Sequence, residues 1–320
     1  MDAKPLLRTE RHRAGLTQRQ LAERTEVPRG TIARIEAGQT DPRAAPAAHL
    51  LPFGPMKGLV LAGGTATRLY PLTLVTNKHL LPVFDRPMID YPIETLAGMG
   101  IRDVLVIVGG KSVGDIVELL ADGHAFGLDL TYRFQRGALG IAHAIGLARR
   151  FVGADAFCTV LGDNVLLGEP LAEVAAAFEA SPYGAGTLLY EVPDPHRFGV
   201  AEFRRPDGSP ADGTRDDDVL VGFEEKPEQP KSHFIPIGVY FLRRDVFDVI
   251  EQLVPSARGE FEITDVLNHY LAQGGIFWRR YGGRWTDAGT VDSLMAATRL
   301  AADDAARGVL PPPRGVDGPR

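Results

Sequence analysis

The sequence predicts an α/β protein, a Rossmann-like three-layer α/β/α domain with a mixed sheet, preceded by a small all-α segment. Three observations predict it. Short apolar or β-branched runs alternate with helical patterns through the middle of the chain, as in sheets covered by helices. A proline-rich stretch at 41–55 separates this part from the N-terminus. Residues 1–43 carry nine Lys and Arg against six Asp and Glu, although the whole chain has a net charge of −6.

The bulk composition limits the class of protein. With 320 residues, 44% hydrophobic and 24% charged, the chain has the composition of a globular protein with a real core. No apolar run approaches the roughly 20 residues that cross a bilayer, and the N-terminus lacks a secretory signal. We therefore expect a cytoplasmic protein with no membrane partner. The single cysteine, Cys158, excludes an internal disulfide framework and fits a reducing compartment.

The elements of the main domain follow from these patterns in order. Strands are expected at 57–64, 103–110, 129–135 and 156–163, and helices at 88–100, 112–123 and 140–152. In open α/β sheets ligands bind beyond the carboxyl ends of the strands, which is where Gly63, Gly64 and Asp163 would lie. The polar stretch at 204–218 is rich in Gly, Pro and Asp, so it should form an exposed loop.

The sequence LAGGTATRLYPLT at 61–73 directly follows the first expected strand. Its glycines allow a close backbone approach to a phosphate, and the forked guanidinium of Arg68 can grip two phosphate oxygens. Lys78 would add a second cation if the chain folds back. An ordinary glycine-rich turn with a surface arginine explains the same residues. The segment matches neither the Walker pattern nor the dinucleotide pattern.

Several motifs together are more specific. The pattern A-G-G-x-x-T-R-L-x-P is followed by K-x-L-L-P, and then by LGDN (161–164), FGVAEF (198–203), EEKP (224–227), ARGEFEITD (257–265) and WTDAGT (285–290). In this order they resemble the sugar-1-phosphate nucleotidyltransferases, most of all the glucose-1-phosphate thymidylyltransferase branch. The resemblance covers roughly residues 56–300. We therefore divide the chain into a helix-turn-helix-like segment (1–43), a linker (44–55), a nucleotidyltransferase domain (56–301) and a flexible C-terminal tail (302–320).

The resemblance implies a reaction and a set of site residues. A nucleotidyl group would pass from dTTP or UTP to glucose 1-phosphate, giving dTDP-glucose or UDP-glucose and pyrophosphate, with Mg²⁺ as cofactor and homo-oligomeric assembly. Arg68, Lys78 and Lys226 would be catalytic, and Asp163 and Asp287 would hold the metal. The nucleotide would contact Leu61, Ala62, Gly63, Gly64, Thr65, Ala66, Thr67, Gln135, Gly140 and Asp163. The sugar phosphate would contact Gly199, Glu225, Lys226 and Arg258.

These roles agree with the chemistry of phosphoryl transfer. Joining two phosphates concentrates negative charge, so catalysis requires positioning and cations. Two carboxylates together with phosphate oxygens suit Mg²⁺. No general base is needed, because a phosphate monoester is already ionised at neutral pH. The side chain of Gln135 offers a donor and an acceptor to a pyrimidine edge.

Five residues depart from the family pattern, among them Pro236 and Ile237 in the segment that follows Lys226. Ala66 replaces a glycine in the phosphate loop, which costs on the order of 1 kcal/mol if the position needs a positive φ. Leu139 replaces an acid before Gly140, and Phe198 replaces a tyrosine beside the sugar. The exact sugar and base therefore stay open. So does an alternative function, a catalytically weakened regulator that senses sugar nucleotides and acts through the helix-turn-helix.

The N-terminal segment resembles the helix-turn-helix of small bacterial repressors. Thr17 and Gln20 form a capping box, and Gly38 would end the second motif helix. Arg29, Thr31 and Arg34 would lie on that helix and face a major groove. We expect at most weak DNA binding. Because Met56 lies where relatives begin, it also stays open whether residues 1–55 belong to the biological product.

Overall fold

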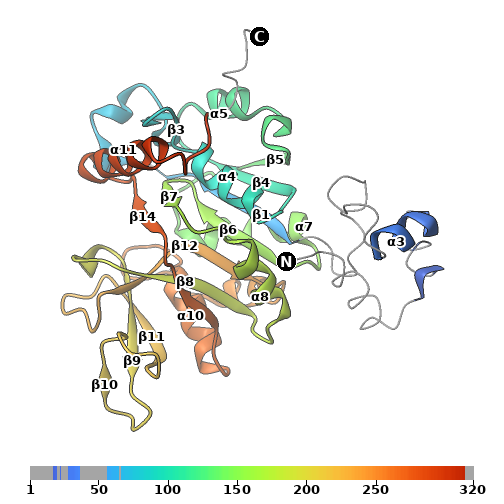
Figure 1. Cartoon of the computed structure of the whole chain (residues 1–320). Helices are drawn as coiled ribbons and strands as arrows, with labels where there is room; N and C mark the ends of the chain where they lie inside the picture. The colour runs from blue at the N-terminus through green and yellow to red at the C-terminus, as the bar shows by residue number, and fades with distance from the viewer. Residues whose placement is uncertain (1–16, 20–21, 23–27, 37–55, 65, 314–320) are drawn as a thin grey trace. The chain divides into compact units, whose positions relative to one another are not determined.

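The chain divides into two compact units, Met1–Met56 and Lys57–Arg320. The computed structural model describes residues 17–19, 22, 28–36, 56–64 and 66–313 (Figure 1). In the first unit, α3 (Arg29–Glu36) is the helix expected to carry Arg29, Thr31 and Arg34, and Ile32 within it is fully buried. The predicted roles of Gln20 and Gly38, and the linker at 44–55, lie outside the described residues.

A seven-stranded mixed sheet forms the centre of the second unit, with the strand order β13-β8-β12-β6-β1-β4-β5. Its strands are β1 (Lys57–Ala62), β4 (Asp103–Val108), β5 (Asp129–Phe134), β6 (Phe157–Leu161), β8 (Ala185–Glu191), β12 (Phe234–Leu242) and β13 (Phe277–Arg280). β6, β1, β4 and β5 are parallel, whereas β12 runs antiparallel to both β6 and β8. The predicted mixed sheet and its first four strands are confirmed.

Helices cover both faces of this sheet, as the strand alternation requires. Leu59 and Leu61 of β1 share a core with α6 (Ile141–Gly146), α9 (Val246–Ile250) and α10 (Ile263–Ala272). On the other face, a Cβ on Gly58 would touch Leu96 of α4 (Asp90–Gly98), and Phe241 of β12 packs on Phe178 of α8 (Ala172–Ala180). The predicted three-layer α/β/α architecture is therefore confirmed. None of the helices in the described part of the chain is long and apolar enough to span a membrane.

Two further helices complete the pattern along the chain. The helix expected at 112–123 is α5 (Val113–Leu120). The helix expected at 140–152 is split into α6 and α7 (Arg149–Val152). Smaller sheets flank the main one and comprise β2 (Pro82–Val83) with β3 (Arg86–Pro87), β7 (Asn164–Leu167) with β14 (Arg284–Asp287), and β9 (Gly199–Arg204) with β10 (Pro210–Ala211) and β11 (Val219–Glu225). The loop predicted at 204–218 thus contains β10, which pairs with the end of β9.

The C-terminal helix extends further than the sequence suggests. α11 (Val291–Ala306) passes the expected boundary at 301, and the chain beyond it is held in place. Arg86 Nη2 donates to the carbonyl of Pro311 at 2.6 Å, and Leu310 packs on a core cluster. The predicted flexible tail is therefore wrong for residues 302–313. In Figure 1, α11 and β10 lie at opposite ends of this unit.

Candidate active site

The glycine loop that we expect to hold phosphate begins where β1 ends, between the ends of β6 and β4. Leu61 and Ala62 are buried in the strand itself, and Gly64 has a φ of 101°. Ala66 adopts the left-handed conformation, with φ 52° and ψ 35°. The condition on which the cost of Ala66 depends is therefore met, and its methyl group costs on the order of 1 kcal/mol in this conformation. Thr65 lies outside the described residues, and Thr67 begins a 3₁₀ turn, Thr67–Leu69, that carries Arg68.

Two aspartates distant in the sequence meet beside this loop. Asp163 follows β6, and its carbonyl accepts from the amide of Ala288 at 2.8 Å. Asp287 ends β14 and lies opposite Asn164 of β7. A Cβ placed on Gly289 would lie 3.0 Å from Asp287 Oδ2, 3.5 Å from Asp163 Oδ2 and 3.4 Å from Arg68 Nη2. Glycine at position 289 therefore leaves the space around which both carboxylates and Arg68 gather.

The carboxylates differ in their electrostatic surroundings. Burial raises the pKa of Asp287, and the charge of Asp163 raises it further, while Arg197 and Arg68 oppose the shift. Burial also raises the pKa of Asp163, but the nearby Lys78 ammonium outweighs it and lowers that pKa to about 2. Asp163 is thus ionised at neutral pH, whereas Asp287 is held in an environment that penalises its charge.

Each aspartate has a cationic partner. Lys78 Nζ lies 2.6 Å from Asp163 Oδ2, and both side chains are 15% exposed. Arg197 Nη2 lies 3.3 Å from Asp287 Oδ2. The fold-back that brings Lys78 to the phosphate loop is therefore present. Two hard carboxylates within reach of one another, one of them penalised when charged, fit a divalent cation such as Mg²⁺, which takes few protein carboxylates together with phosphate oxygens. The residues present fit that cofactor.

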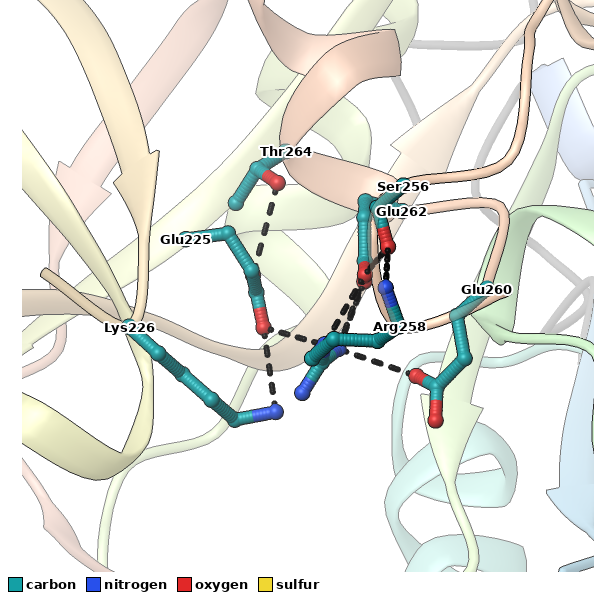
Figure 2. A network of polar contacts seen from close by, with 7 residues as sticks. All are labelled: Glu225, Lys226, Ser256, Arg258, Glu260, Glu262 and Thr264. Carbon is teal, nitrogen blue, oxygen red and sulfur yellow. Dashed lines mark hydrogen bonds and ion pairs between the residues drawn. The ribbon is translucent and has the colours of Figure 1, made fainter.

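A second polar network lies where the sugar phosphate is expected (Figure 2). Arg258 Nη2 contacts Glu225 Oε1 at 3.3 Å, Glu260 Oε2 at 2.9 Å and Glu262 Oε1 at 2.8 Å. Lys226 Nζ lies 3.3 Å from the same Glu225 oxygen. The network thus gathers two cations at Glu225, with Glu262 buried behind them.

Backbone features support this network. Gly199 lies close to it, because a Cβ there would come within 2.6 Å of Thr264 Cγ2 and 3.3 Å of Glu225 Oε2. Lys226 has a φ of 47°, a conformation that is unfavourable for a residue with a side chain and that concentrates at functional sites. The structure therefore brings Gly199, Glu225, Lys226 and Arg258 together, as expected.

The residues expected at the base also converge. Gln135 follows β5, and a Cβ on Gly63 would lie 2.6 Å from Gln135 Oε1. Gly140 has a φ of 98°, and a Cβ there would lie 2.4 Å from the carbonyl oxygen of Phe261. The backbone carbonyl of Leu139 accepts a hydrogen bond from the backbone amide of Phe261, at 2.9 Å. The segment expected to contact the base, which contains Leu139 and Gly140, is therefore joined by backbone contacts to the segment that carries Arg258.

Sequence reasoning missed four residues that shape the site. Arg197 and His143 belong to no charge or metal-ligand pattern, so only their contacts reveal them. His79 is buried with its Nδ1 2.7 Å from Asn77 Oδ1, and burial, followed by the charge of Lys78, lowers its pKa to about 3. Asn164 accepts from Trp285 Nε1 at 2.6 Å. Asn164 belongs to the LGDN motif and Trp285 to the WTDAGT motif. The hydrogen bond between these two residues joins the two motifs.

Comparison with known proteins agrees with this geometry. The family model "Nucleotidyl transferase" matches residues 57–304. A glucose-1-phosphate thymidylyltransferase from Neisseria meningitidis is 40% identical over 244 residues, 76% of this chain and 81% of that protein. A nucleotidyltransferase of low-salt glycan biosynthesis from Haloferax volcanii is 39% identical over 267 residues, 82% of this chain and 71% of that protein.

A solved structure and a second family model complete the comparison. A Bacillus anthracis protein assigned as a glucose-1-phosphate thymidylyltransferase, solved with sucrose, is 44% identical with a TM-score of 0.70, and the match covers 78% of this chain and 96% of that one. A helix-turn-helix domain model matches residues 6–51, which extends past the expected boundary at 43. The chain thus belongs to the nucleotidyl transferase family, and its main unit is a nucleotidyltransferase that follows a helix-turn-helix segment.

Proposed function

We propose that the main unit transfers a nucleotidyl group from dTTP or UTP to glucose 1-phosphate with Mg²⁺ and releases pyrophosphate. The observation that carries the proposal is the meeting of Asp163, Asp287 and Arg68 around Gly289, next to the glycine loop at the carboxyl end of β1. The relatives that are 40% identical are thymidylyltransferases of this type. The glycan-biosynthesis relative leaves room for another nucleotide or sugar.

The reaction needs charge neutralisation more than acid-base chemistry. A phosphate oxygen of glucose 1-phosphate attacks the α-phosphorus, a new phosphorus–oxygen bond forms, and the bond to the pyrophosphate oxygen breaks. We assign the attacking phosphate to Lys226 and Arg258, the α-phosphate to Lys78, and the departing pyrophosphate to Arg68. When bound, Mg²⁺ would be held by Asp163 and Asp287 and would neutralise phosphate oxygens.

The ion pairs at the two aspartates show where Lys78 and Arg197 lie when no substrate is bound. Lys78 and Arg197 each lie against one of the two aspartates, so neither cation is a free surface charge. A phosphate oxygen offers each of them an alternative partner. On the sugar side, Glu225 and Gly199 would orient the hydroxyls, and Arg258 would exchange a glutamate contact for the phosphate.

Pyrophosphate release tests the proposal. The full chain should release pyrophosphate with dTTP or UTP only when a hexose 1-phosphate and Mg²⁺ are both present, and glucose 1-phosphate should be the best acceptor in a panel. Reactions without sugar phosphate supply the control. If the chain binds dTTP or UTP tightly but no combination gives turnover, the result rejects the enzyme and favours the sugar-nucleotide-sensing regulator.

For the first unit we propose weak DNA binding through α3, supported by the helix-turn-helix match and the excess of Lys and Arg in residues 1–43. The full chain should be retained on duplex DNA at low salt more strongly than a chain shortened to residues 56–320, and added salt should abolish the difference. Equal retention of the two chains would refute DNA binding by this segment.

A further inference from the structure

The side chain of Gln135 is buried with one of its two amide atoms paired. Gln135 is 8% exposed, and its backbone amide donates to the carbonyl of Val108 at 2.8 Å. Its side-chain Nε2 lies 3.1 Å from His143 Nδ1. An amide NH₂ can only donate, so His143 Nδ1 must accept, and its proton must then be on Nε2. With the Gln135 amide in this orientation, the contact corresponds to the His143 tautomer that carries its proton on Nε2.

The other amide atom, Oε1, faces the phosphate loop. A Cβ on Gly63 would lie 2.6 Å from this oxygen, so the oxygen rests directly against the loop backbone. Within the described part of the chain, no donor pairs with it. A carbonyl oxygen accepts hydrogen bonds, so a ligand that brings a donor can pair with it. The oxygen is thus available to a group bound at the loop.

His143 is held in place from its other side. Its ring stacks on Phe261, with centroids 6.3 Å apart and an interplanar angle of 28°. The backbone of Phe261 is itself fixed, because its amide donates to Leu139 at 2.9 Å and its carbonyl accepts from Ala142 at 3.2 Å. The imidazole therefore sits between a base-reading amide and the segment that carries Arg258, and it has little freedom to turn.

We propose that His143 is a positioning residue that makes the site select thymine or uracil over cytosine, because it holds Gln135 with the acceptor oxygen turned toward the base. Thymine and uracil present an N3–H donor, whereas the N3 of cytosine is an acceptor that would face the same oxygen unfavourably. The inference rests on the proposed function, since it requires a nucleotide at the Gly63 loop. In this proposal His143 contacts no substrate, but it determines whether Gln135 presents its acceptor oxygen or its amide NH₂ to the base.

The test compares kcat/KM for dTTP and dCTP, with glucose 1-phosphate saturating, in the wild type and two variants. The wild type should prefer dTTP at least roughly ten-fold. His143→Leu removes the acceptor and frees the amide to rotate, so the dTTP-to-dCTP ratio should fall roughly ten-fold, mainly through KM for dTTP. His143→Gln supplies an acceptor oxygen at the same place and should restore most of the ratio. KM for glucose 1-phosphate should stay unchanged in both variants.

A third variant guards against loss of folding. His143→Lys offers only donors, so Gln135 would turn its oxygen toward the ammonium and present its NH₂ to the base. The ratio should then shift toward dCTP, a gain that a damaged fold does not produce. An unchanged ratio in His143→Leu, or a wild type that uses dTTP and dCTP equally, overturns the role of His143 while the proposed function stands. A wild type with no turnover of any nucleotide rejects the proposed function itself.

Discussion

Replacement of Asp287 by asparagine should lower kcat by roughly 10³-fold without reducing the thermal stability of the chain. The loss follows because a carboxylate that helps to hold a divalent cation contributes several kcal/mol of charge stabilisation in the transition state. The stability is kept because, without a bound metal, the charge of the Asp287 carboxylate destabilises the folded protein. Burial and the charge of Asp163 raise the pKa of Asp287, so its ionised form is unfavourable and a neutral amide removes the repulsion. The ion pair to Arg197, which is 40% exposed, contributes little against this.

The pH dependence has a definite sign. A carboxyl whose pKa is raised on folding binds its proton more tightly in the folded state, so protonation adds stability as pH falls through the raised pKa. The stability advantage of Asp287→Asn, measured by thermal unfolding without metal, should therefore be present at neutral pH. It should shrink as pH falls through the raised pKa toward the ordinary value of 3.8.

A matched control is Asp292→Asn, the same change at an exposed position in the first turn of α11. The kcat of this variant should stay within about two-fold of the wild-type value. Its stability should fall slightly, because an acidic residue near a helix N-terminus is lost. A kcat for Asp287→Asn close to that of this control would show that Asp287 is not part of the catalytic machinery.

Replacement of Lys226 by methionine should reduce kcat/KM for glucose 1-phosphate by roughly 10²–10³-fold, while KM for the nucleotide changes little. The ammonium is one of two cations gathered at Glu225, and its removal leaves the attacking phosphate with Arg258 alone. Steady-state kinetics with each substrate varied in turn measures the two effects separately.

The backbone at Lys226 sharpens this experiment. Because its φ of 47° is unfavourable for any side chain, Lys226→Gly should be more stable than Lys226→Met, by about 1 kcal/mol, yet equally impaired. Lys231→Met, which changes an exposed lysine paired with Glu202 and Glu224, is the control and should remain active. If Lys226→Gly keeps wild-type activity, the ammonium has no role and the strained backbone needs another explanation.

Much of the fold could be predicted because it depends on local patterns. The alternation of apolar strands and amphipathic helices predicts the parallel core, and the rule for carboxyl ends of strands places Gly63, Gly64 and Asp163 at one edge. The positive φ of Ala66 agrees with the glycine that the family pattern has at this position. The three-layer architecture was predicted on the same basis.

The remaining features depend on contacts between distant segments. The register of β14 with β7 sets Asp287 opposite Asn164, and no periodicity encodes that pairing. Arg197 and His143 are single residues whose importance appears only from their partners. The prolines after α11 suggested a flexible tail, but Arg86, more than two hundred residues earlier in the chain, fixes the carbonyl of Pro311.

The most direct measurement is the binding of Mn²⁺, a paramagnetic substitute for Mg²⁺, followed by electron paramagnetic resonance in the presence of dTTP. Asp163 and Asp287 should together hold one ion for each chain, so the wild type should show one tight site, and either Asp163→Asn or Asp287→Asn should remove it while Asp292→Asn keeps it. Tight binding that survives in both of the first two variants would contradict a shared metal site and the reaction assigned to it.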